Sequence, residues 1–136
     1  AVIHETFDPE RNAAINPHAA AMTGNPGPVP EFCIGVFSDS IVHRFVRECG
    51  GEKIAEFQSV TGNRDYYRVN LFGTEVLLFV PLVGAPAAAG MLEEIIPLGC
   101  QYFVFLGCCG VLRHDIADGH IILPAAAVRA EGLSYH

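Results

Sequence analysis

The chain has 136 residues, of which 51% are hydrophobic and 17% are charged, so it holds enough apolar material for one packed core and too little charge for a disordered protein. Eight lysine and arginine residues against fifteen aspartate and glutamate residues give a formal net charge of −7. This acidic balance disfavours nucleic-acid binding, which needs many basic side chains to neutralise phosphates.

The uncharged apolar run at residues 76–92 is broken by proline and glycine and is shorter than the roughly 20 apolar residues that a membrane-spanning helix needs. We therefore expect a core segment and no membrane partner. No basic start followed by an apolar stretch and a cleavage site is visible, so no secretory signal is recognised. The five cysteines lie mostly in apolar runs, which favours buried reduced thiols in a cytoplasmic protein, and no spacing of cysteines or histidines predicts a metal site.

The first predicted segment, residues 1–31, is an extended arm rich in proline, glycine and asparagine, residues that break both helix and sheet. Residues 32–36 form a continuous apolar run of the kind found in a strand buried on both faces. A helix capped within residues 38–40 is predicted next. Its apolar residues recur at helical spacing up to Cys49, and two glycines then end it.

Residues 53–60 and 66–72 alternate loosely between polar and apolar side chains. Gly73 and Thr74 separate the second of these runs from residues 75–80, which are apolar except for Glu75, a pattern typical of a hairpin. An antiparallel excursion is therefore expected in the middle of the chain.

Pro86 suits the first position of a helix that continues to Ile96. A buried strand is predicted over residues 102–106, and a further strand is predicted from Ile121 towards Val128. Together these elements predict an α/β fold with a mixed, mostly parallel twisted sheet flanked by helices.

Three corners between a strand and the following loop are expected to carry the chemistry, because ligands of open α/β sheets bind outside the carboxyl ends of the strands. These corners are residues 37–40, 82–86 and 107–110. Glycine in the last two would let backbone N–H groups approach an anion or a sugar.

The order of these corners is the most specific pattern in the chain. Residues 84–86 lead into Leu-Glu-Glu-Ile-Ile-Pro-Leu-Gly at 92–99, residues 103–110 read Phe-Val-Phe-Leu-Gly-Cys-Cys-Gly, and residues 118–134 close the pattern. In this order the chain resembles the N-terminal half of the nucleoside phosphorylase family, which includes uridine phosphorylase, the hexameric purine nucleoside phosphorylases and the methylthioadenosine nucleosidases. The resemblance implies that residues 32–136 are the N-terminal part of such an α/β domain and that the fold is incomplete.

The resemblance implies a pentosyltransferase that cleaves the N-glycosidic bond of a purine or pyrimidine nucleoside. Inorganic phosphate would be the co-substrate, with no other cofactor, and the protein would be a homo-oligomer. Because the sugar passes through an oxocarbenium-like state, such a site has to hold phosphate near the ring and stabilise the charge that leaves with the base.

Matching the family residue by residue places candidate phosphate and substrate contacts, with the catalytic residues themselves left unassigned. An arginine usually lent by a neighbouring subunit falls on Arg64, with Arg68 as the fallback. A histidine that reaches a neighbour's ribose corresponds to His18, and the hydroxyl that assists phosphate falls on Cys108. The full set of candidates is Ser38, Asp39, Arg64, Gly84, Gly107, Cys108, Gly110 and His18.

The match also shows departures from the family at the phosphate loop. Phe37 stands where the family has glycine, and Ile41 and Phe105 stand where it has arginine. The loss of two charge-assisted contacts keeps two alternatives open. One is a nucleosidase that uses water in place of phosphate, and the other is a catalytically impaired relative that binds a nucleoside.

Overall fold

The computed structural model describes residues 27–116, 119–128 and 130–133. The helices and strands within these residues are β1 (Phe32–Val36), α1 (Asp39–Glu48), β2 (Glu52–Phe57), β3 (Arg64–Leu71), β4 (Thr74–Phe79), α2 (Ala85–Ile95), the short 3₁₀ helix η3 (Ile96–Leu98) and β5 (Tyr102–Leu106). The strand–helix order predicted as far as residue 106 is confirmed, with bounds that differ by a few residues. The predicted burial of residues 102–106 is wrong, because β5 is at the edge of the sheet and most of its side chains are exposed among the described residues.

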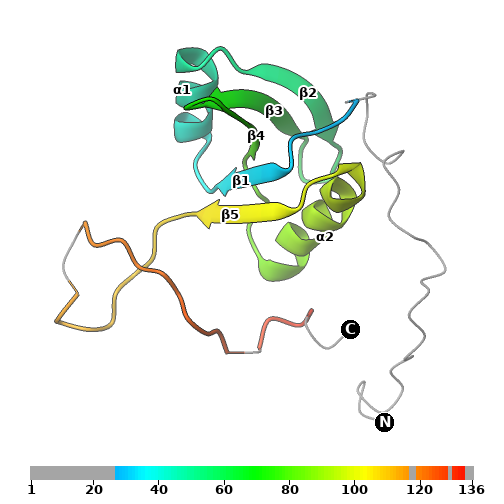
Figure 1. Cartoon of the computed structure of the whole chain (residues 1–136). Coiled ribbons are helices and arrows are strands. Elements are labelled where there is room, and N and C mark those ends of the chain that lie inside the picture. The colour runs from blue at the N-terminus through cyan, green and yellow to red at the C-terminus, as the bar shows by residue number, and fades with distance from the viewer. Residues whose placement is uncertain (1–26, 117–118, 129, 134–136) are drawn as a thin grey trace, which may run out of the picture.

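The five strands form one mixed sheet in the order β2-β3-β4-β1-β5 (Figure 1). β1 lies between β4 and β5 and is parallel to both, whereas β3 is antiparallel to β2 and to β4. Four of the five strands therefore run in the same direction, as the fold class predicted. The expected antiparallel strand is β3, which lies between β2 and β4 and runs in the opposite direction to both.

The two helices cover opposite faces of the sheet. Val42 of α1 packs with Val76 and Leu78 of β4, while Met91 of α2 packs with the alternate β4 residue Leu77. Because successive side chains of a strand point to opposite faces, these contacts make three layers, helix on sheet on helix. Apolar burial on both faces explains why β1 and β4 are continuous apolar runs.

Local sequence explains the hairpin between β3 and β4. Phe72 and Gly73 form its turn with positive φ angles of 52° and 89°, as a two-residue turn of the primed type requires. The Gly73 amide also donates to the Asn70 side chain at 2.9 Å. The tight turn therefore fixes the pairing of Leu71 with Thr74.

The predicted strand from Ile121 towards Val128 is wrong. Residues 121–128 have no regular secondary structure, and the side chains of Ile121 and Val128 are 99% and 90% exposed. Apolar residues favour a strand only where a neighbouring strand pairs with them, and within the described residues none does. The described residues also contain no helix long and apolar enough to cross a membrane.

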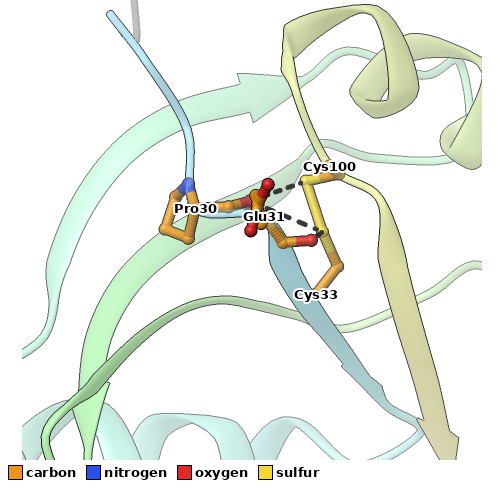
Figure 2. The surroundings of a disulfide bond; sticks show 4 residues. All are labelled: Pro30, Glu31, Cys33 and Cys100. Carbon is orange, nitrogen blue, oxygen red and sulfur yellow. Dashed lines mark hydrogen bonds between the residues drawn. A yellow bond between two sulfur atoms is a disulfide. The ribbon is translucent and has the colours of Figure 1, made fainter.

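The expectation that all five cysteines are reduced is also wrong. Cys33 of β1 and Cys100, two residues before β5, form a disulfide (Figure 2). The parallel pairing of β1 with β5 aligns Phe32 with Tyr102, so the start of β1 lies next to the residues that precede β5, and the Cα atoms of the two cysteines are 6.3 Å apart. Both are buried beside the carbonyl group of Pro30. Three cysteines, at positions 49, 108 and 109, are free.

Candidate functional site

The three predicted corners meet at one edge of the sheet. β1, β4 and β5 are adjacent and parallel, so the loops that follow them, residues 37–40, 80–84 and 107–110, leave from the same edge. The chain continues from β1 into α1 on one face and from β4 into α2 on the other. Neighbouring strands whose connections turn to opposite faces form the crevice in which α/β proteins bind ligands.

A polar hollow of about 130 Å³ lies on the α1 side of this edge. Asp39 begins α1 and Arg64 begins β3, and both line this hollow although 25 residues separate them in sequence. They meet because β3 runs antiparallel to β4 and therefore starts where β4 ends. The complete lining is Asp39, His43, Asn63, Arg64, Asp65, Tyr67 and Val80.

Arg64 is a cationic residue of the polar hollow whose guanidinium group has N–H donors without partners among the described residues. One terminal nitrogen donates to the carbonyl of Asn63 at 3.0 Å, while the buried Nε has no hydrogen-bond partner within the described part of the chain. A guanidinium group has five N–H donors in a planar fork that matches an oxyanion. Arg64 can therefore accept an anionic ligand without giving up an existing ion pair.

Asp65, by contrast, is already engaged. Lys53 lies 2.6 Å from its carboxylate, and the Tyr67 hydroxyl donates to it at 3.0 Å. Burial acts to raise the pKa of Asp65, but the bonds from Lys53 and Tyr67 outweigh it and hold the pKa below its usual value. The same hydrogen bonds, to Asp65 and then to Glu56, raise the pKa of Lys53. Asp65 is therefore neutralised locally, and it adds little repulsion against an anion in the polar hollow.

A second, larger hollow of about 500 Å³ lies at the end of β5 and is called here the β5-end hollow. Gly107, Cys108 and Cys109 line it. The rest of its lining is Phe105, Leu106, Val111, Ile116, Gly119, His120, Ile121 and Ile122. The structure therefore brings two of the predicted residues together here, as it brings Asp39 and Arg64 together in the polar hollow. The two hollows do not share a lining residue.

An aromatic cluster occupies the corner between β1 and β5. The ring centroids of Phe37 and Phe105 are 6.2 Å apart, and Phe105 meets buried Phe79 edge-on at the same distance. The Phe37 amide donates to the carbonyl of Leu106 at 2.9 Å, which fixes the ring at the strand ends. A Cβ added at Gly107 would lie 3.3 Å from the Phe37 ring. The positions that carry glycine and arginine in the resembled family thus hold packed aromatic rings.

The remaining predicted residues are more dispersed. Ser38 is the residue before α1, and its Oγ lies 3.1 Å from that of Ser40 without capping the helix backbone. Gly84 precedes α2 with a positive φ of 106°, and Gly110 lies outside both hollows. His18 lies outside the described residues.

The fallback residue Arg68 has a different neighbourhood. It lies four residues further along β3, opposite Glu52 and Leu77, and it donates to the carbonyl of Pro28 at 2.8 Å. Arg68 therefore holds the segment that leads into β1 and is absent from the lining of the polar hollow.

The sequence interpretation missed several residues of the polar hollow. His43 follows Asp39 by one helical turn, a spacing that places both on one face of α1. Asn63 flanks Arg64 directly. The i, i+4 spacing could have identified His43, whereas its meeting with Arg64 depends on the sheet order.

Within the described residues, no group of three or more His, Cys, Asp or Glu side chains is arranged to hold a metal ion. The groups at this edge that could bind an anionic substrate are Arg64, the start of α1 without a side-chain cap, and the loop glycines.

Comparison with known proteins gives a consistent result. Residues 32–136 match the model of the phosphorylase superfamily. A uridine phosphorylase from Treponema pallidum is 33% identical over 113 residues, which cover 76% of this chain and 44% of that protein. A guanosine phosphorylase from Halorubrum lacusprofundi is 34% identical over 77 residues, which cover 55% of this chain and 32% of that protein.

The fold itself resembles a solved structure, that of purine nucleoside phosphorylase from Toxoplasma gondii in complex with immucillin-H. The TM-score is 0.55 at 18% identity, over 74% of this chain and 38% of that one. This chain thus spans less than half the length of the curated relatives it matches.

Proposed function

Because the chain belongs to the phosphorylase superfamily, we propose that the protein carrying it cleaves the N-glycosidic bond of a purine or pyrimidine nucleoside with inorganic phosphate. The products are the free base and a pentose 1-phosphate. The observation that supports this proposal most directly is the meeting of Arg64 with the start of α1 at the ligand-binding edge of the sheet. The similarity to uridine and guanosine phosphorylases supports the same reaction class.

The proposed phosphate contacts combine a side chain and a helix end. The first-turn N–H groups of α1 have no side-chain cap, and such groups at a helix N-terminus favour anions. The Arg64 guanidinium adds charge-assisted hydrogen bonds. The Asp39 carboxylate lines the same hollow. The phosphate that fits beside it is therefore one that keeps a P–O–H group, which donates a hydrogen bond to the Asp39 carboxylate.

In the proposed reaction, a phosphate oxygen attacks the anomeric carbon as the bond from carbon to base nitrogen breaks. The base leaves with the bonding electron pair and takes up a proton. Only contacts that strengthen as the sugar becomes cationic accelerate this step. A phosphate held by Arg64 would supply negative charge near the ring, and the loop glycines at 84, 107 and 110 would let backbone N–H groups approach the substrate.

A homo-oligomer, a cytoplasmic location and a ribose contact from His18 belong to the same proposal. No cofactor other than phosphate is proposed.

The test is base release from a panel of purine and pyrimidine nucleosides, measured with and without phosphate. We expect release that requires phosphate. Arg64→Gln should raise the KM for phosphate at least about tenfold, because a charge-assisted hydrogen bond contributes roughly 1.5–3 kcal/mol. Arg44→Gln is the matched control, since Arg44 is an exposed residue of α1 that pairs with Glu48 and lies outside the polar hollow.

One specific observation favours a second function, hydrolysis of the same bond. The neighbouring, partly exposed rings of Phe37 and Phe105 lie at the corner where the resembled family binds phosphate, and an apolar corner disfavours an anion. Base release that is indifferent to phosphate would support this nucleosidase and refute the phosphorylase. No release, with nucleoside binding detected by calorimetry, would indicate the impaired relative.

A further inference from the structure

Two adjacent thiols stand at the mouth of the β5-end hollow. Cys108 and Cys109 are both free and exposed, and they follow β5 directly after Gly107. The other free cysteine, Cys49, is partly buried at the end of α1. The remaining two cysteines form the disulfide already described. The chain therefore has one site at which two free thiols are neighbours.

The position of this pair allows both sulfur atoms to bind one centre. Consecutive Cα atoms are about 3.8 Å apart across a trans peptide. In a strand the two side chains would point to opposite faces, but β5 ends at Leu106, and the loop after it has no regular secondary structure. The pleat therefore does not force the two thiols apart.

The lining of the hollow next to the thiols contains several apolar side chains. Its lining includes Val111, Ile116 and Ile121, and its volume is about 500 Å³. A space of this size exceeds the needs of a single ion and can take an aromatic ring. Thiolates are soft ligands that prefer soft, polarisable centres, so the hollow suits a thiophilic atom that carries an apolar group.

We propose that Cys108 and Cys109 form a dithiol site for a trivalent organoarsenical. Trivalent arsenic is pyramidal, and its narrow angle between two sulfur ligands matches thiols on neighbouring residues, whereas a two-coordinate linear cation needs sulfur atoms on opposite sides. In the reaction with an aryl arsenoxide, two As–S bonds form and the As=O bond breaks. The two thiol protons leave with that oxygen as one water, and no atom changes its oxidation state.

Occupation of this site has a consequence for the proposed function. Cys108 is one of the candidate substrate contacts, and the arsenical would fill the β5-end hollow beside the loop glycines. Base release should therefore be blocked. Binding itself does not depend on the proposed function, because it needs only the two thiols and the hollow.

The experiment treats the complete protein with one equivalent of phenylarsine oxide and then with excess monothiol, and measures the intact mass under native conditions. We expect one adduct per chain, heavier by one phenylarsine oxide less one water, that survives the monothiol and is removed by a dithiol. Cys108→Ser and Cys109→Ser should each lose this resistance to the monothiol. Cys49→Ser, the matched control, should retain it.

Circular dichroism establishes that each variant is folded, which exposed serine substitutions should not disturb. An adduct that the monothiol removes from the wild-type protein, or one that persists in Cys108→Ser, would overturn the proposal. A stable adduct on a protein without phosphate-dependent base release would leave the dithiol site standing and refute the phosphorylase. Phosphate-dependent base release with no stable adduct would refute the dithiol site and leave the phosphorylase standing.

Discussion

The disulfide between Cys33 and Cys100 is expected to be a major contributor to the stability of this chain. It joins residues 67 positions apart and so restricts a large loop of the unfolded chain. In the chain-entropy model, closing a loop of that length corresponds to about 4 kcal/mol at 25 °C. Small domains are typically stable by only about 5–15 kcal/mol, so reduction should remove a large share of the total.

We expect the folded structure to accommodate the two thiols of the reduced protein. Cys33 and Cys100 are 1% and 2% exposed, and reduction removes no heavy atom, so it leaves no cavity in the core. The Cys100 sulfur lies 3.3 Å from the carbonyl oxygen of Pro30 (Figure 2), which would accept a hydrogen bond from the thiol. The loss of stability should therefore come mainly through the unfolded state.

The assay is urea unfolding of the same protein with the disulfide intact and after reduction in urea and refolding with a dithiol reductant. With an m-value of roughly 2 kcal/mol/M, the midpoint should fall by roughly 2 M. Alkylation in denaturant without reductant should label three cysteines of the wild-type protein, those at 49, 108 and 109. Coincident unfolding curves, or five labelled cysteines, would refute this reasoning.

Three further predictions follow from packing and charge. Gly35→Ala should destabilise the protein by about 1–3 kcal/mol, because the added Cβ would lie 2.7 Å from a ring carbon of Phe105. Gly90→Ala, within helix α2, should stabilise it by roughly 0.5–1 kcal/mol, because the added Cβ would meet no described atom within 4 Å other than the backbone of its own helix and its chain neighbours. Tyr66→Phe should be neutral or stabilising by up to about 1 kcal/mol, because the buried Tyr66 hydroxyl has no hydrogen-bond partner among the described residues. Lys53→Gln should lower the urea midpoint only slightly at pH 7, because the ion pair that it removes is exposed to solvent, and the difference should disappear in acid once Asp65 is protonated.

Urea unfolding measures all of these changes, and the direction of the pH effect follows from the lowered pKa of Asp65. A carboxyl group whose pKa is lowered by folding stabilises the protein above its ordinary pKa, and this contribution is lost as the pH falls through the lowered value. A Lys53→Gln penalty that persists in acid after the carboxylates are protonated would show that the ion pair is not its cause. A neutral Gly35→Ala or a strongly destabilising Tyr66→Phe would contradict the packing described here.

Much of the fold was predictable because its elements are marked locally. The apolar run of β1, the glycines after α1 and the proline at the start of α2 each specify an element within a few residues. The strand expected after Ile121 failed for the opposite reason, since its apolar residues pair with no strand within the described part of the chain. The disulfide was missed because Cys33 and Cys100 become neighbours only through the pairing of β1 with β5.

The candidate site was predictable only in part. The strand-end loops could be located from glycine and from the order of strands, but the meeting of Asp39 with Arg64 depends on the return of β3 beside β4. The aromatic contact between Phe37 and Phe105 likewise needs the adjacency of β1 and β5. Local patterns do not contain such non-local pairings, which are set by the whole sheet.

The central claim is that the protein transfers a pentosyl group to phosphate, and the identity of the sugar product tests it most directly. Phosphorus NMR of a reaction containing nucleoside, inorganic phosphate and the complete protein should show a pentose 1-phosphate formed in equal amount to the released base. Free base accompanied by unphosphorylated pentose would contradict the claim and identify a hydrolase.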